Sequence, residues 1–283
     1  MTESKPVLDG FEERFLEDRA TTLRYLVGGA GPPLLLVHGF AGAASNFAVL
    51  APLLARRHRV LVPELPGHGG SSPLPAAPNL AAYADRVAAV AAHEAIGSAA
   101  VLGHSMGGVV ALRLAVRRPD LVQALVLAAA AGISTASRVA GIFLATTSLL
   151  KPGRRIAAFR GRIARSPRLR ALALDGFSTS DGAALSEAAT LGFLSGSRLY
   201  TDIASAGRAL AREDVRLDLE RVGCPALVLW GARDRQVAID DAVEYARRLR
   251  APLRTIADCG HLLVGERPDA CADAVERFLA GLG

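Results

Sequence analysis

Lysine, cysteine and aromatic residues are scarce in this sequence of 283 residues, and long apolar runs are missing. The three cysteines, Cys224, Cys259 and Cys271, form no C-x-x-C pair and are too few for a disulfide-stapled scaffold, so we expect a reduced, cytoplasmic protein. No stretch of about 18 apolar residues is uninterrupted, and we therefore expect no membrane-spanning helix. The first ten residues lack the basic and apolar regions of a signal peptide.

The charge of the chain comes almost entirely from arginine, because only Lys5 and Lys151 among the 33 basic residues are lysine. Eight basic residues and no acidic residue lie between positions 151 and 170. A nucleic-acid surface would need aromatic or polar readers among the charges, and Phe159 is the only aromatic there, so we expect no nucleic-acid partner. We interpret the run as a solvated arginine face; attraction of an anionic group of the substrate is the alternative.

Strand and helix patterns alternate along the first 130 residues. Residues 11–17 and 21–27 predict a hairpin, and residues 79–96 predict a helix that Asn79 caps and Gly97 ends. Short apolar runs predict buried strands at 34–37, 59–62, 99–102 and 124–127, and again at 225–230 and 253–256. This alternation favours an α/β fold with a mostly parallel, doubly wound sheet.

The rhythm changes between residues 133 and 212, where the pattern is helical and no strand is evident. We expect an α/β core made of residues 1–132 and 213–283, interrupted by a helical cap subdomain at 133–212. We expect this subdomain to decide the size of the molecule that the protein accepts. Phe143, Phe177 and Phe193 are its candidate substrate-binding residues.

A G-x-S-x-G motif follows one predicted strand and opens the next helix, at residues 103–107. The sharp turn requires glycines because it leaves no room for Cβ atoms, and it exposes the central serine above the sheet. Ser105 is therefore the predicted nucleophile, and the helix that follows favours developing negative charge at its N-terminus.

A serine hydroxyl needs a base and an acid that orients the base. His261 is the only one of the six histidines that follows the last predicted strand, so it is the expected base. Asp234 follows the 225–230 strand, and the order serine, acid, histidine fits it. The alternative acids are those at positions 240, 241 and 258. The backbone N–H groups of Phe40 and Met106 are the expected oxyanion donors.

Together these residues resemble the α/β-hydrolase family, in its serine-nucleophile branch with a helical cap. The resemblance rests on five motifs in order: HGF at 38–40, ELPGHGGSS at 64–72, GHSMGG at 103–108, LWGARD at 229–234 and CGH at 259–261. It implies an eight-stranded sheet. Glu64 departs from the pattern, since members of the family more often have aspartate there. The G-x-S-x-G turn is called the nucleophile elbow, and here its central residue is serine. This argues against epoxide hydrolases and haloalkane dehalogenases, which use aspartate as the nucleophile.

The expected activity is hydrolysis of a carboxylic ester or related small-molecule acyl substrate through an acyl-enzyme on Ser105, without metal or cofactor. The alternatives are cleavage of a carbon–carbon bond in a diketone-type substrate, acyl transfer to an acceptor other than water, and non-catalytic ligand binding. We expect a monomer or a homodimer.

Overall fold

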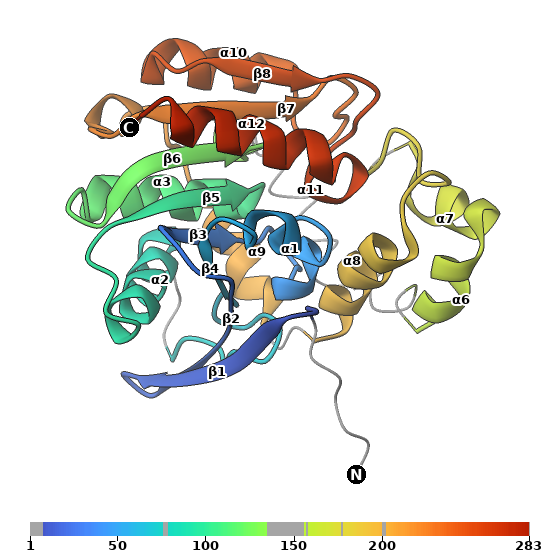
Figure 1. Ribbon diagram of the computed structural model, residues 1–283, viewed down its shortest axis with the longest axis horizontal. Helices are drawn as coiled ribbons and strands as arrows, with labels where there is room; N and C mark the ends of the chain where they lie inside the picture. The colour runs from blue at the N-terminus through green and yellow to red at the C-terminus, as the bar shows by residue number, and fades with distance from the viewer. Residues whose placement is uncertain are drawn as a thin grey trace.

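The computed structural model describes residues 8–75, 79–134, 156, 158–176, 178–199 and 202–282. Its sheet has eight strands in the order β1-β2-β4-β3-β5-β6-β7-β8, which confirms the eight-stranded, mostly parallel fold (Figure 1). The strands are β1 (Phe11–Asp18), β2 (Thr21–Gly28), β3 (Pro33–Val37), β4 (Arg59–Pro63), β5 (Ala99–His104), β6 (Val122–Ala128), β7 (Ala226–Gly231) and β8 (Leu253–Ile256).

The first two strands form the expected antiparallel hairpin, in which Phe11 pairs with Gly28, and β2 continues antiparallel onto β4. From β4 to β8 every neighbouring pair is parallel. Carboxyl ends of parallel strands lie at one edge of a sheet, where ligands bind in open α/β folds. The loops after β3, β5, β7 and β8 therefore share an edge.

Helices cover both faces of the sheet. In Figure 1, α12 crosses in front of the strands, whereas α3 and α10 lie behind them. The core helices are α1 (Ala51–Leu54), α2 (Leu80–His93), α3 (Met106–Arg117), α10 (Ile239–Leu249), α11 (Leu263–Glu266) and α12 (Pro268–Ala280), with 3₁₀ helices η1 (Ala44–Phe47) and η3 (Leu219–Arg221). Being covered on both sides, β5 and β7 are buried along their whole length, as their continuous apolar runs predict.

The helix predicted over residues 79–96 is shorter than expected. Asn79 caps it as predicted, with its side chain accepting a hydrogen bond from the Ala82 N–H at 2.9 Å. However, α2 ends at His93, and the left-handed residue that follows is Ala95 with φ 54°, not Gly97. The prediction for Gly97 is wrong because glycine marks a permitted left-handed position but does not fix where the helix stops.

The described part of the segment between β6 and β7 consists of helices joined by turns, with one isolated β-bridge between Asp175 and Thr179. It contains α6 (Arg160–Arg165), α7 (Pro167–Leu174), α8 (Glu187–Leu199) and α9 (Ile203–Arg212). In Figure 1, α6 and α7 lie far from the sheet, whereas α8 lies closer to it. Phe143, Phe177 and residues 151–155 of the basic run lie outside the described residues. The division of the chain into core and cap stays a prediction.

No helix in the described ranges has the length and apolar character needed to cross a bilayer.

Candidate active site

Ser105 lies at the turn between β5 and α3, with the left-handed φ of 56° that this turn imposes on a non-glycine residue. Close packing explains the flanking glycines. A Cβ on Gly103 would lie 2.2 Å from the Gly107 carbonyl oxygen, and one on Gly107 would lie 2.1 Å from the Val37 carbonyl oxygen. The glycines therefore let the elbow pass against β3 and against its own helix, which fixes the position of the serine.

The structure brings the predicted nucleophile, base and acid together. His261 Nε2 lies 3.0 Å from Ser105 Oγ, and His261 Nδ1 lies 2.8 Å from Asp234 Oδ2. The side chains of His261 and Asp234 are 4% and 0% exposed. Water is thus largely excluded from a hydrogen-bonded chain built from three separate loops, and electrostatic interactions there are stronger than at the surface.

The loop after β7 fixes the Asp234 carboxylate in one orientation. Its Oδ1 accepts hydrogen bonds from the N–H groups of Gln236 at 2.8 Å and Val237 at 3.0 Å, which leaves Oδ2 for His261. The alternative acids point elsewhere. Asp241 accepts from Ser134, and exposed Asp258 pairs with Arg233; for Asp240 no contact with His261 is observed in the described residues.

His104, the variable residue of the elbow motif, supports the loop of the predicted base. Its Nε2 lies 2.9 Å from the His261 carbonyl oxygen, and the two rings lie 5.1 Å apart. Burial, and then the neighbouring His261, lower the pKa of His104 to about 3, so it is neutral at pH 7. A neutral ring with Nε2 protonated donates to that carbonyl.

The two expected oxyanion donors flank the serine. Met106 is the first residue of α3, and Phe40 follows β3 in a loop that touches the elbow, since a Cβ on Gly39 would lie 3.0 Å from Ser105 Cβ. Neither the Phe40 nor the Met106 N–H has an acceptor within the described part of the chain. Their role as oxyanion donors stays a prediction.

Two buried histidines hold the loops beside Phe40. His38 Nε2 accepts a hydrogen bond from the Leu65 N–H at 3.0 Å, and the His68 ring lies 5.3 Å from the His38 ring. Burial lowers the pKa of His38 to about 4 and that of His68 to about 3. Both rings are neutral at pH 7, so they serve as structural hydrogen-bonding groups of the loops.

Phe193 of α8, a candidate for substrate binding, is 8% exposed. Its ring packs on α11, because a Cβ on Gly265 would lie 2.4 Å from Phe193 Cε2. Its predicted contact with substrate stays a prediction.

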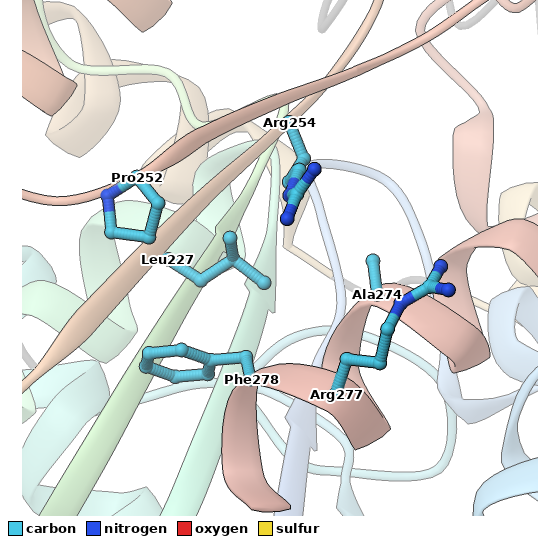
Figure 2. Close-up of a pocket in the computed structure, with 6 residues that line it drawn as sticks. All are labelled: Leu227, Pro252, Arg254, Ala274, Arg277 and Phe278. Atoms are coloured by element: carbon cyan, nitrogen blue, oxygen red, sulfur yellow. The ribbon is translucent and has the colours of Figure 1, made fainter. Parts of the chain in front are cut away.

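A separate hollow of about 150 Å³ lies between β7, β8 and α12 (Figure 2). Its lining includes Leu227, Arg254 and Phe278. Leu227 and Arg254 are near the amino ends of their strands, so this hollow lies toward the edge opposite Ser105.

No group of three or more His, Cys, Asp or Glu residues suited to a metal ion occurs in the described ranges. The expectation that the protein needs no metal or cofactor stays a prediction.

Two buried glutamates near the site were not predicted to have any role there. Glu64 was noted only as a departure from the family pattern, and Glu266 was not singled out. Both are less than a tenth exposed, and both accept hydrogen bonds from backbone N–H groups of the site loops. The only sequence signal for Glu266 is an acid directly after an apolar run, five positions after His261.

The chain belongs to the α/β-hydrolase family, whose model, described as alpha/beta hydrolase fold, matches residues 32–268. A curated relative from Pseudomonas putida, "Dihydrolipoyllysine-residue acetyltransferase component of acetoin cleaving system", is 32% identical over 90% of this chain. The chain spans 65% of that relative, less than two thirds of its length.

Two further proteins resemble the chain over most of both lengths. "2-hydroxy-6-oxo-6-(2'-aminophenyl)hexa-2,4-dienoic acid hydrolase" from Metapseudomonas resinovorans is 28% identical, over 95% of this chain and 91% of the relative. The solved structure of a thermophilic esterase from Thermogutta terrifontis is 26% identical with a TM-score of 0.76, covering 95% of this chain and 98% of the esterase.

Proposed function

We propose that the protein is a serine hydrolase that cleaves a carboxylic ester or related acyl substrate through an acyl-enzyme on Ser105. One observation carries this proposal: the hydrogen-bonded chain from Asp234 through His261 to Ser105, at 2.8 and 3.0 Å. A base within hydrogen-bond distance of a hydroxyl, itself held by a buried carboxylate, is the arrangement that makes serine nucleophilic.

In the first half-reaction Ser105 Oγ attacks the acyl carbon while His261 Nε2 takes the hydroxyl proton. The carbonyl oxygen becomes an oxyanion, which the N–H groups of Phe40 and Met106 stabilise. The imidazolium is stabilised by Asp234. The tetrahedral intermediate then collapses: the bond to the leaving oxygen breaks, and His261 gives that oxygen its proton. The alcohol departs and the acyl group remains on Ser105.

The second half-reaction repeats these steps with water. His261 removes a proton from water, the resulting hydroxide attacks the acyl carbon, and the bond to Ser105 Oγ breaks. Ser105 recovers its proton from His261, and the acid is released. The base is thus returned to its starting state without any external proton donor or redox partner.

The printed names of two relatives favour specific alternatives within this chemistry. The similarity to the dienoic acid hydrolase over nearly the whole chain supports carbon–carbon cleavage of a diketone-type acid. The acetyltransferase component supports acyl transfer to an acceptor, although the chain spans only 65% of that protein. Non-catalytic ligand binding is less consistent with the hydrogen-bonded Ser105.

A panel of chromogenic esters and thioesters of graded acyl length tests the proposal, with Ser105→Ala as the blank. We expect the wild type to hydrolyse at least one of these substrates, and we expect the rate to fall to the uncatalysed level in folded Ser105→Ala. Faster turnover of a vinylogous diketone acid than of any ester would favour carbon–carbon cleavage, and a rate that depends on an added acceptor would favour acyl transfer. Wild-type turnover by folded Ser105→Ala would overturn the mechanism.

The cytoplasmic location, the absence of a nucleic-acid partner and the monomeric or homodimeric state stay predictions from the sequence.

A further inference from the structure

Glu266 is a buried carboxylate that the proposed reaction does not use. It is the last residue of α11 and is 8% exposed. Its oxygens accept hydrogen bonds from the Gly260 N–H at 3.0 and 3.1 Å and from the Ser180 N–H at 2.9 Å. Burial raises the pKa of Glu266, although these backbone hydrogen bonds and the nearby Arg267 oppose the rise, and no ion pair of Glu266 occurs within the described ranges. Its position therefore depends on these backbone donors.

One of those donors directly precedes the predicted base. Gly260 lies in a narrow slot: a Cβ there would be 2.8 Å from the Ser180 nitrogen, and a Cβ on Gly231 would be 2.1 Å from the Gly260 carbonyl oxygen. The peptide before His261 is thus held between the end of β7 and residues 179–180, and Glu266 closes the slot. A shift of this peptide would move the imidazole away from Ser105.

The other donor belongs to a short segment between α7 and α8, far away in sequence. We call residues 178–180 the docking segment. The Ser178 carbonyl oxygen accepts from the Leu262 N–H at 3.2 Å, and Ser178 Oγ accepts from Gln236 Nε2 at 2.9 Å. The Gln236 N–H in turn donates to Asp234 Oδ1. The docking segment therefore contacts the loops of both the predicted acid and the predicted base.

We propose that Glu266 is a positioning residue that joins the docking segment to the His261 loop, so that the docking segment contributes to the geometry of the base. This inference rests on the proposed function. Glu266 Oε2 accepts from both the Ser180 and the Gly260 N–H groups, and Oε1 accepts from Gly260 as well. Whichever way an amide lies in this place, its NH₂ group faces at least one of these N–H donors, so glutamine cannot keep all three hydrogen bonds.

Glu266→Gln is the direct test, with Glu276→Gln as the matched control. Glu276 lies on α12 and pairs with His58 at 3.1 Å. We expect kcat for ester hydrolysis by Glu266→Gln to fall about 10- to 100-fold, as for a small misplacement of a catalytic group. KM should change little, because substrate contacts are retained. Glu266→Asp keeps the charge but is one methylene shorter, so its kcat should lie between those of Glu266→Gln and the wild type. Glu276→Gln should retain wild-type kcat.

Hydrogen exchange measured by mass spectrometry gives a readout that does not depend on activity. In Glu266→Gln we expect faster exchange in peptides covering 178–182 and 258–262, with no change in peptides covering 44–54. If the wild type hydrolyses no ester but these two peptides respond together, the proposed function fails and the coupling stands.

Three results would overturn the coupling. They are unchanged kcat and exchange in folded Glu266→Gln, equally faster exchange throughout the protein, or an effect of Glu276→Gln of the same size. If Glu266→Gln does not fold, Glu266→Asp carries the same comparisons, and its unchanged kcat and exchange would overturn the proposal.

Discussion

The two sides of Ser105 are each held by a buried glutamate, but among the described residues only Glu64 forms an ion pair. Glu64, on the side of Phe40, accepts from the Ala44 N–H at 3.0 Å and from the Gly70 N–H at 2.6 Å. Arg24 of β2 compensates its charge at 2.8 Å. Among the described residues, Glu266, on the side of His261, accepts from backbone N–H groups alone, and one of these belongs to the docking segment.

This difference separates anchoring by the sheet from anchoring by the docking segment between α7 and α8. The Phe40 side takes its buried charge pair from the hairpin and from loops of the core. The His261 side instead depends on residues 178–180. Displacing the docking segment should therefore affect His261 before it affects the Phe40 side.

The largest effect should come from the acid on the His261 side. Asp234→Asn keeps the shape of the side chain but favours the wrong imidazole tautomer, and kcat should fall about 10⁴-fold. Asp241→Asn is the control, since that carboxylate contacts Ser134 and not His261. Steady-state kinetics on one ester would measure both, and a loss of the same size in Asp241→Asn would show that the acid has been assigned wrongly.

The next effect, on stability, concerns the Phe40 side. Arg24→Met leaves Glu64 buried without its compensating cation, which should lower the free energy of unfolding by about 3–5 kcal/mol. Urea denaturation would measure it. An exposed pair provides the comparison: Arg118→Met, opposite Asp120 at the surface, should cost less than about 1 kcal/mol. Equal losses would mean that the Arg24 pair contributes nothing beyond a surface contact.

The Phe40 side also contacts a helix between β6 and β7, namely α8. This contact tests whether the two sides of Ser105 are anchored differently. A Cβ on Gly192 of α8 would lie 2.1 Å from the Ser45 carbonyl oxygen in η1, so Gly192→Ala should cost about 1–3 kcal/mol of stability. Gly161→Ala in α6 meets only Arg165 Nη1, at 4.0 Å, and should be neutral or stabilising. Thermal unfolding of both would measure this. If folded Gly192→Ala lost as much kcat as Glu266→Gln, the Phe40 side and the His261 side would both depend on the segment between β6 and β7.

A smaller effect should appear as a pH dependence of stability. The raised pKa of Glu266 means that the folded state binds its proton more readily than the unfolded state. The ionised carboxylate therefore costs stability above the folded pKa, and this cost disappears as the pH falls below the unfolded value. The free energy of unfolding of the wild type, relative to Glu266→Gln, should rise on acidification by at most about 1.4 kcal/mol per pH unit. A difference that falls with decreasing pH would contradict the sign.

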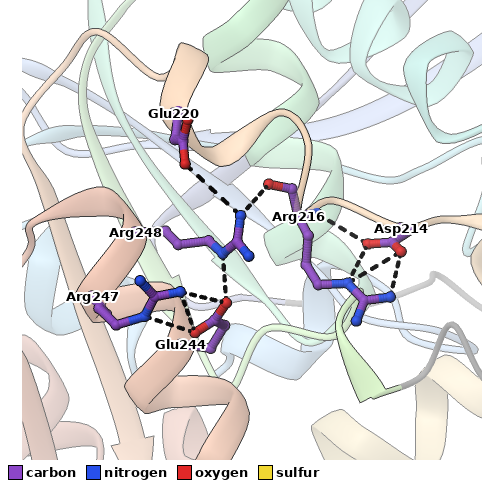
Figure 3. Close-up of polar contacts among 6 residues, drawn as sticks. All are labelled: Asp214, Arg216, Glu220, Glu244, Arg247 and Arg248. Carbon is purple, nitrogen blue, oxygen red and sulfur yellow. Dashed lines mark hydrogen bonds and ion pairs between the residues drawn. The ribbon is translucent and has the colours of Figure 1, made fainter.

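The smallest effect, of opposite sign, is expected at the surface beside α10. Figure 3 shows the Arg216 guanidinium hydrogen-bonded to the Asp214 carboxylate, while Arg248 lies between Glu220 and Glu244. The hydrogen bond from Arg216 lowers the pKa of Asp214. The pair therefore stabilises the folded state at neutral pH, and this stabilisation is lost as the pH falls through the pKa of Asp214 in the folded protein. Asp214→Asn should cost less than about 1 kcal/mol at pH 7. A larger cost, or one that survives in strong acid, would contradict this interpretation.

The sheet and the elbow could be predicted because their signals are local. A few neighbouring residues are enough to predict the buried strands β5 and β7 from their apolar runs. The same holds for the sharp turn at Ser105, which the flanking glycines indicate. The loops of Phe40, Asp234 and His261 follow from the parallel sheet, since the ends of its strands share one edge.

The docking segment could not be predicted, because it approaches the loops it contacts only in the folded chain. Nothing in the sequence near Ser180 indicates a contact with Glu266, which lies 86 positions away. The pairing of Glu64 with Arg24 is equally non-local, and so is the contact of His104 with the His261 carbonyl oxygen. The end of α2 was predicted wrongly for a different reason. Ala95 adopts a left-handed conformation, which nothing in the local sequence indicates.

Covalent labelling by a fluorophosphonate, with the adduct mapped by mass spectrometry, tests the activation of Ser105 most directly. We predict one adduct per chain, on Ser105, with a labelling rate that collapses in His261→Ala and is unchanged in Glu276→Gln. Labelling at another residue, or labelling of Ser105 at the wild-type rate in His261→Ala, would contradict the account.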